Sequence, residues 1–122
     1  MSLETMRPTP TWDEASYEDT VDTLAAHDDL TYKVWAGDWC KDCRALLPDF
    51  GAALAAADIP DERIEEIALD EEKQGPGVEE YGIEYIPTIV VERDGDEVTR
   101  FVEKEALPPA VWLADQLERE LE

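Results

Sequence analysis

Apolar residues recur along the chain with two different spacings, and these predict helices and strands in alternation. Apolar positions three and four residues apart predict helices over about 16–27 and 41–57, and a last helix that opens at Pro108 or Pro109. Short, mostly apolar runs between polar or Gly/Pro-rich segments predict strands. These runs cover residues 31–36, 63–69, 87–92 and 98–102, and residues 77–81 predict a short helical turn.

The order of these elements predicts an α/β fold. The first two strands are separated by the helix over 41–57 and should pair in parallel. The last two are joined by a turn at 93–96 that contains Gly95, and should pair antiparallel. We therefore expect a central mixed β-sheet flanked by helices on both faces. The 122 residues suit one domain, expected over 16–122, preceded by an N-terminal arm over 1–15 with little periodicity.

Both cysteines of the chain lie at one junction, between the strand over 31–36 and the helix over 41–57. Cys40 and Cys43 are separated by two residues, a spacing typical of a dithiol/disulfide redox centre. Cys40 would lie at a helix N-terminus, where free N–H groups and the helix dipole stabilise a thiolate. The alternatives are a structural disulfide, or half of a metal or cluster site shared by a dimer. Four-ligand zinc would need more Cys and His than the chain has.

The charge of the chain is strongly one-sided. Thirty-two Asp and Glu against 10 Lys and Arg give a net charge of −22 at pH 7, and the acids are spread along the sequence. Such a surface repels itself at low salt, and the repulsion is screened at high salt, where the Debye length is ~3 Å at 1 M. We therefore expect a protein of a salt-rich cytoplasm, with a docking face for a basic partner as the alternative. The sign of the charge disfavours nucleic acid as a partner.

The sequence contains no sign of a membrane partner or of export. No segment approaches the ~18 apolar residues of a membrane span. The N-terminus lacks the basic-then-apolar pattern of an export signal. We therefore expect a cytoplasmic protein, and in a reducing cytosol a C-x-x-C pair is more often catalytic or metal-binding than structural.

The motif W-C-K-D-C at residues 39–43, together with the order of the elements, resembles the thioredoxin family over about residues 16–121. Pro48, inside the second helix, is similar to that family's helix-kinking proline. The segment Y-I-P-T at residues 85–88 is similar to the one that carries its cis-proline. The W-C-x-D-C form is closer to thioredoxin-related proteins of the W-C-P-D-C kind than to the W-C-G-P-C thioredoxins proper.

The resemblance implies a thiol–disulfide oxidoreductase that needs no bound cofactor and no metal. Cys40 would be the nucleophile and Cys43 the resolving thiol that attacks the mixed disulfide. A cis Ile86–Pro87 bond would turn the backbone of Ile86 outward to pair with an extended substrate strand. The residues expected to form the substrate surface are Trp39, Tyr85, Ile86, Pro87 and Thr88.

Three positions depart from the family pattern. Val34 stands where the family has a buried aspartate, six residues before the first cysteine. Glu66 falls at or near the position of that aspartate's lysine partner, and Glu103 replaces a glycine after the hairpin. These departures leave open which group accepts the proton of Cys43. The candidates are Asp42, Glu66 and Asp38.

The leading hypothesis is a cytosolic reductase of protein or small-molecule disulfides. Its partner would be a dithiol electron donor such as a thioredoxin-reductase-like flavoenzyme. The alternatives are a thioredoxin-fold binding or adaptor module with an incidental dithiol, or a disulfide oxidase or isomerase. The direction of electron flow follows from the reduction potential, which spans about −270 to −120 mV across related dithiols.

Overall fold

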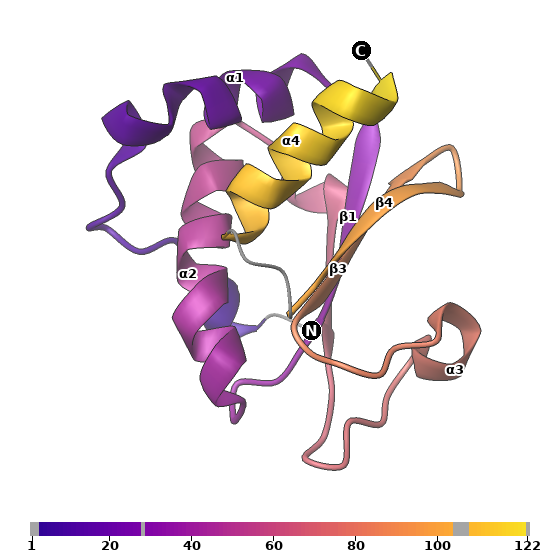
Figure 1. Ribbon diagram of the computed structural model, residues 1–122. Coiled ribbons are helices and arrows are strands. Elements are labelled where there is room, and N and C mark those ends of the chain that lie inside the picture. Colours follow the sequence, from indigo (N-terminus) through magenta and orange to yellow (C-terminus); the bar gives the residue numbers. More distant parts are fainter. Residues whose placement is uncertain (1–2, 28, 104–107, 122) are drawn as a thin grey trace.

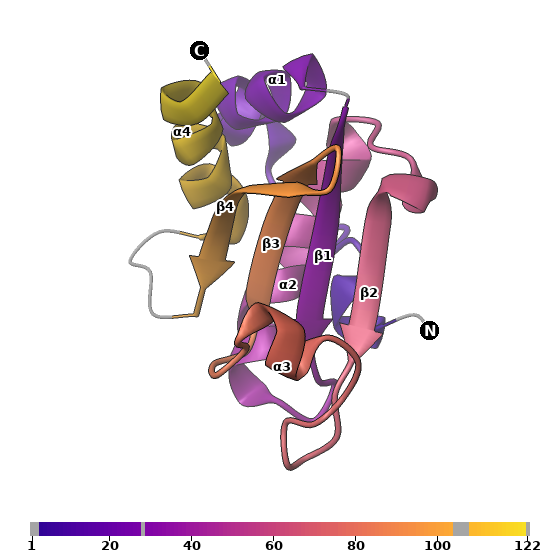
Figure 2. The ribbon, with the colours of Figure 1, turned by 90° about the vertical axis from the view of Figure 1, so that its right-hand side faces the viewer.

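The computed structural model describes residues 3–27, 29–103 and 108–121. Within these ranges a four-stranded sheet forms the centre of the molecule, with strand order β2-β1-β3-β4 (Figures 1 and 2). β1 pairs in parallel with β2 and antiparallel with β3, and β3 pairs antiparallel with β4. This confirms the expected mixed sheet. The strands are β1 (Leu30–Ala36), β2 (Ile64–Ala68), β3 (Thr88–Arg93) and β4 (Asp96–Val102).

Helices lie on both faces of the sheet, but unequally. The three longer helices, α1, α2 and α4, cover one face, and the single turn α3 lies on the other (Figure 1). Three short 3-10 turns complete the regular structure of the described residues. The helices are α1 (Glu18–Ala26), α2 (Lys41–Ala56), α3 (Val78–Tyr81) and α4 (Pro109–Leu121), and the 3-10 turns are η1 (Glu4–Met6), η2 (Glu14–Tyr17) and η3 (Asp61–Arg63).

The face that carries α3 is held by aromatic and charged side chains. The Trp35 indole stacks at a tilt on Tyr81, with 4.8 Å between the ring centroids. Lys33 Nζ donates to the Tyr81 hydroxyl at 2.9 Å and lies 3.2 Å from the Glu92 carboxylate. These contacts fix the one-turn helix to β1 and β3, and so fix the chain that leads from α3 into residues 85–88.

The N-terminal residues are packed against the domain, where the sequence predicted an arm. Leu3 and Met6 are 2% and 6% exposed and belong to the hydrophobic core. η1 lies against α2 so closely that a Cβ on Gly51 would come within 2.1 Å of the Met6 carbonyl oxygen. A glycine at this helix position therefore lets the two backbones touch. Residues 1 and 2 of the expected arm lie outside the described residues.

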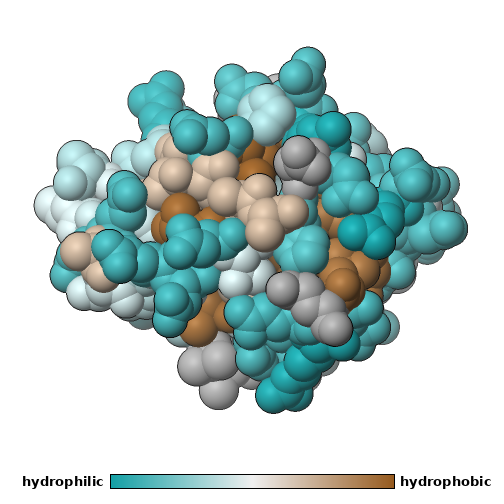
Figure 3. Space-filling model, turned by 90° about the horizontal axis from the view of Figure 1, so that it is seen from above, coloured by the Kyte–Doolittle hydropathy of each residue, from teal (hydrophilic) through white to brown (hydrophobic). Residues whose placement is uncertain are grey.

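The surface is strongly hydrophilic, as the net charge of −22 requires. Figure 3 shows the end of the molecule formed by α1, the C-terminal end of α4 and the β3–β4 hairpin, where hydrophilic residues surround smaller hydrophobic patches. No helix within the described residues has the length and apolar character that crossing a membrane demands.

Candidate active site

Cys40 is the N-cap residue of α2. β1 ends at Ala36, a short connection follows, and α2 begins at Lys41. Cys40 has extended backbone angles, φ −82° and ψ 123°, and its sulfur accepts a hydrogen bond from the Cys43 N–H at 3.4 Å. The first turn of a helix offers N–H groups without intrahelical partners, and its dipole favours negative charge. The start of α2 therefore places a hydrogen-bond donor at the Cys40 sulfur.

Cys43 lies beneath Cys40, one turn into the helix. Both cysteines are free thiols, Cys40 is 9% exposed and Cys43 is fully buried. Burial raises the pKa of the Cys43 thiol above its ordinary value, and the hydrogen bond with Cys40 acts in the same direction, whereas the backbone of Gly37 opposes the shift. Cys43 therefore holds its proton at neutral pH, and Cys40 is the more exposed residue of the pair.

The segment before β3 faces the dithiol. The Cys40 thiol points at the Ile86 carbonyl oxygen, 4.0 Å away, and the Ile86–Pro87 peptide bond is cis. Tyr85 is 38% exposed, whereas Ile86 and Pro87 are buried. The Thr88 hydroxyl donates to the Tyr85 carbonyl, and with 2% exposure this side chain supports the turn from within rather than contributing surface.

Trp39 precedes Cys40 in the chain, and its indole is anchored beyond the end of β2. Its indole Nε1 donates to the Leu69 carbonyl oxygen at 2.9 Å, just beyond the end of β2, and the side chain is 36% exposed. A Cβ on Gly37 would lie 2.4 Å from that same Nε1, so the indole folds back over the glycine. The exposed aromatic surface beside Cys40 therefore consists of Trp39 and Tyr85.

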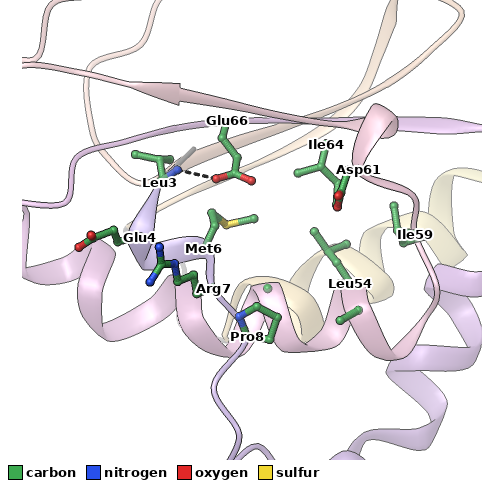
Figure 4. A pocket seen from close by; sticks show the side chains of 12 residues that line it. Leu3, Glu4, Met6, Arg7, Pro8, Leu54, Ile59, Asp61, Ile64 and Glu66 are labelled. Carbon is green, nitrogen blue, oxygen red and sulfur yellow. Dashed lines mark hydrogen bonds between the residues drawn. The ribbon is translucent and has the colours of Figure 1, made fainter. Parts of the chain in front are cut away.

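The three candidate proton acceptors lie in different environments. Asp38 accepts hydrogen bonds from the backbone N–H groups of Glu4 and Thr5, at 3.2 and 3.0 Å. Glu66 pairs with Val34 in the sheet register and accepts the Leu3 N–H at 2.6 Å (Figure 4). Both carboxylates therefore bind the N-terminal turn.

Asp42, in contrast, is exposed on the first turn of α2. Its charge contributes to the raised pKa of Cys43, so it lies within electrostatic range of that thiol. Of the three acids, Asp42 alone contributes to the pKa shift of Cys43, and Asp38 and Glu66 are hydrogen-bonded to the backbone of residues 3–5.

Several parts of this site are backbone groups that the sequence does not single out. They include the Gly37 amide, the Leu69 carbonyl and the amides of residues 3–5, none of which carries a side-chain signal. Only Gly37 gives a signal in the sequence, because a glycine between a buried strand and a tryptophan indicates that another group packs closely against its backbone. No group of three or more Cys, His, Asp and Glu residues in the described ranges is placed to hold a metal ion. Glu103 follows β4, and the connection over 104–107 lies outside those ranges.

A free dithiol at the start of a helix, beside a strand-entry turn on a mixed α/β sheet, places the protein in the class of thiol–disulfide oxidoreductases. Comparison with known sequences then gives the family. The family model described as Thioredoxin matches residues 9–110, and the chain belongs to the thioredoxin family.

Individual relatives agree with this assignment. A thioredoxin of Chlamydia trachomatis is 31% identical over 87 residues, which cover 71% of this chain and 79% of the relative. A thioredoxin of Chlamydia pneumoniae is 37% identical over 65 residues, or 53% of this chain and 60% of the relative. The match to protein disulfide-isomerase of Oryctolagus cuniculus, 26% identical over 106 residues, covers 75% of this chain but spans only 21% of that longer protein.

Solved structures share the fold. Thioredoxin NaTrxh from Nicotiana alata superposes with a TM-score of 0.58 at 20% identity, covering 100% of this chain and 99% of that one. A mutant thioredoxin from Halobacterium salinarum NRC-1 gives a TM-score of 0.52 at 21% identity, covering 100% and 97%. At these identities the likeness establishes the thioredoxin-like fold and nothing finer.

Proposed function

We propose that this protein is a cytoplasmic reductase of substrate disulfides, with Cys40 as the attacking and Cys43 as the resolving thiol. The observation that carries the proposal is the asymmetry of the pair. Cys40 caps α2 and borders an exposed surface of Trp39 and Tyr85, whereas Cys43 is fully buried beneath it. One sulfur is thus available to a substrate and the other to Cys40 alone.

The reaction takes two exchange steps. The Cys40 thiolate attacks one sulfur of the substrate disulfide, forms a mixed disulfide and releases the first substrate thiolate. Cys43 then gives up its proton and attacks the Cys40 sulfur, which closes the Cys40–Cys43 disulfide and releases the second substrate thiolate. Two electrons pass from the dithiol to the substrate. The substrate strand would lie along Tyr85, Ile86 and Pro87, and pair with the Ile86 backbone.

The second step needs a group that takes the proton of Cys43, because burial raises the pKa of this thiol. We assign this role to Asp42. The support is that Asp42 lies on the first turn of α2 with its charge acting on the pKa of Cys43, whereas Asp38 and Glu66 are engaged by the backbone of residues 3–5. The resolving step should slow in Asp42→Asn and keep its rate in Glu66→Gln, as followed by stopped-flow; the reverse pattern would favour Glu66.

The oxidised protein needs a dithiol donor to return to the reduced state. Thioredoxins act with reductases, and one similar structure is a complex of a thioredoxin f2 with ferredoxin:thioredoxin reductase. For this chain we propose a thioredoxin-reductase-like flavoenzyme as the donor. The spread of acids along the chain, with a net charge of −22, supports a salt-rich cytoplasm as the place of reaction.

Reduction of a model protein disulfide tests this function. In about 2 M KCl, chosen so that the Debye length is a few ångströms, the wild-type protein with a chemical dithiol as donor should turn over the disulfide. Cys40→Ser should lose this turnover entirely. A wild-type protein that binds partners but leaves the disulfide intact would instead be the adaptor module.

A further inference from the structure

Two carboxylates, Asp38 before the dithiol and Glu66 on β2, hold the same short N-terminal turn. Both oxygens of Asp38 are used, Oδ2 for the Glu4 N–H at 3.2 Å and Oδ1 for the Thr5 N–H at 3.0 Å. Glu66 Oε1 accepts the Leu3 N–H at 2.6 Å (Figure 4). These three donors lead into the first turn of η1, where N–H groups lack intrahelical partners. Three charge-assisted hydrogen bonds to two carboxylates therefore hold the turn in place.

Packing makes this attachment rigid. Leu3, Thr5 and Met6 are 2%, 6% and 6% exposed, and Leu3 and Met6 join the core cluster. The Met6 carbonyl oxygen lies where a Cβ on Gly51 would collide with it, so η1 and α2 are in backbone contact. Residues 3–6 thus contact the β1–α2 connection, β2 and α2, and the first and last of these carry Cys40 and Cys43.

Asp38 lies two residues before Cys40, in the connection that presents its sulfur. Trp39, the next residue, anchors to the Leu69 carbonyl oxygen, and the Cys40 N–H donates to the Gly37 carbonyl oxygen at 3.0 Å. The connection is thereby held by the N-terminal turn, by the chain after β2 and by its own turn. The position of the Cys40 sulfur follows from this connection, because Cys40 is its last residue before α2 and caps the helix by accepting the Cys43 N–H at 3.4 Å.

We infer that Asp38 is a positioning residue, which uses the N-terminal turn of residues 3–6 to hold Cys40 in its helix-capping geometry. The inference rests on the proposed role of Cys40 as the attacking thiol. Asp38 acts through the backbone of Glu4 and Thr5 and takes no proton. The turn of residues 3–6 then contributes to the geometry of the dithiol site.

The test measures a single reaction, the attack of the Cys40 thiol on a small disulfide reagent. In a Cys43→Ser background, the rate constant of Cys40 with 5,5′-dithiobis(2-nitrobenzoic acid) is measured from pH 6 to 9. Asp38→Ala should lower the rate constant at neutral pH by about fivefold, because the capping donors no longer align with the sulfur. Removing a negative charge alone should favour the thiolate and raise it. Asp42→Asn, which removes an exposed charge without an anchor, is the matched control and should react faster.

A second pair of variants keeps Asp38 intact. Glu4→Pro removes one N–H donor to Asp38, and proline is tolerated there because Glu4 opens η1 and Leu3 before it is extended, with φ −94° and ψ 129°. Glu4→Ala removes the same side chain but keeps the donor. We expect Glu4→Pro to react about twofold more slowly than Glu4→Ala, since one of two contacts to a charged group is lost.

Two results would overturn the inference. One is an acceleration in Asp38→Ala equal to that in Asp42→Asn, and the other is equal rates in Glu4→Pro and Glu4→Ala. If Asp38→Ala fails to fold, the Glu4 pair decides. Failure of the proposed function looks different, because Cys40 would then be unreactive in the Cys43→Ser parent itself.

Discussion

At the scale of single residues, the two thiols differ in their position at the start of α2, since Cys40 caps the helix and Cys43 lies buried in its first turn. Cys40 receives the first-turn N–H of Cys43, and Cys43 is enclosed by the core. The same C-x-x-C spacing thus yields one sulfur that caps the helix and a second, fully buried one whose pKa burial raises. This difference orders the two steps of the proposed reaction.

The buried thiol makes the stability of the reduced protein depend on pH. Burial raises the pKa of Cys43 in the folded state above its ordinary value of 9.0. At a pH between the unfolded-state pKa and the folded-state pKa, the unfolded chain has lost the thiol proton and the folded chain keeps it. The stabilisation is fully present below pH 9 and is lost as pH rises toward the folded pKa. Denaturant unfolding of the reduced protein should show a decline of about 1 kcal/mol between pH 9 and 10.

Cys43→Ala is the control for this prediction, because it removes the thiol and should remove the decline. The buried Tyr32, whose pKa is also raised, begins to contribute only above its ordinary value of 10.0. An equal loss of stability in Cys43→Ala between pH 9 and 10 would show that another group titrates.

The sequence predicts where the two cysteines lie, but not what the nearby acids bind. The placement of Cys40 and Cys43 at a strand–helix junction follows from local pattern, because spacing and flanking elements are contiguous in the chain. The partners of Asp38 and Glu66 could not be predicted in this way. They are backbone amides 33 to 63 residues away, which only the folded chain brings into contact.

At the scale of elements, the strands and long helices follow from periodicity, and the N-terminal turn does not. α2 extends over Lys41–Ala56, close to the expected 41–57, because its apolar positions repeat over four turns. η1 has three residues, too few to show any period, and its burial depends on Gly51 in a distant helix. The arm expected over residues 1–15 includes Leu3 and Met6, which the structure places in the hydrophobic core.

At the scale of the whole molecule, the excess of acids is the dominant feature. A net charge of −22 on 122 residues opposes a compact state through self-repulsion, and dissolved salt screens it. This charge bears on where the protein works rather than on its fold, since the thioredoxin-like fold also occurs in chains of other composition.

The melting temperature should therefore rise with salt. Between about 0.1 and 2 M KCl the Debye length falls from ~10 Å to a few ångströms, and the melting temperature should increase by about 10 °C or more. A variant with five exposed acids replaced, at Glu62, Glu71, Glu72, Glu80 and Glu120, all to Gln, should show a smaller increase. A melting temperature that is flat or falls with salt would argue against a salt-rich cytoplasm.

The central claim is that Cys40 attacks a substrate disulfide and Cys43 resolves the product, and trapping the intermediate tests it most directly. Cys43→Ser is mixed with a disulfide-bonded model protein in high salt, and the adduct is located by mass spectrometry with Cys40→Ser as the matched control. The account predicts a stable mixed disulfide on Cys40, and no adduct on Cys43 in the Cys40→Ser protein. An adduct that forms on Cys43 in the control, or none on Cys40 in the trap, would contradict it.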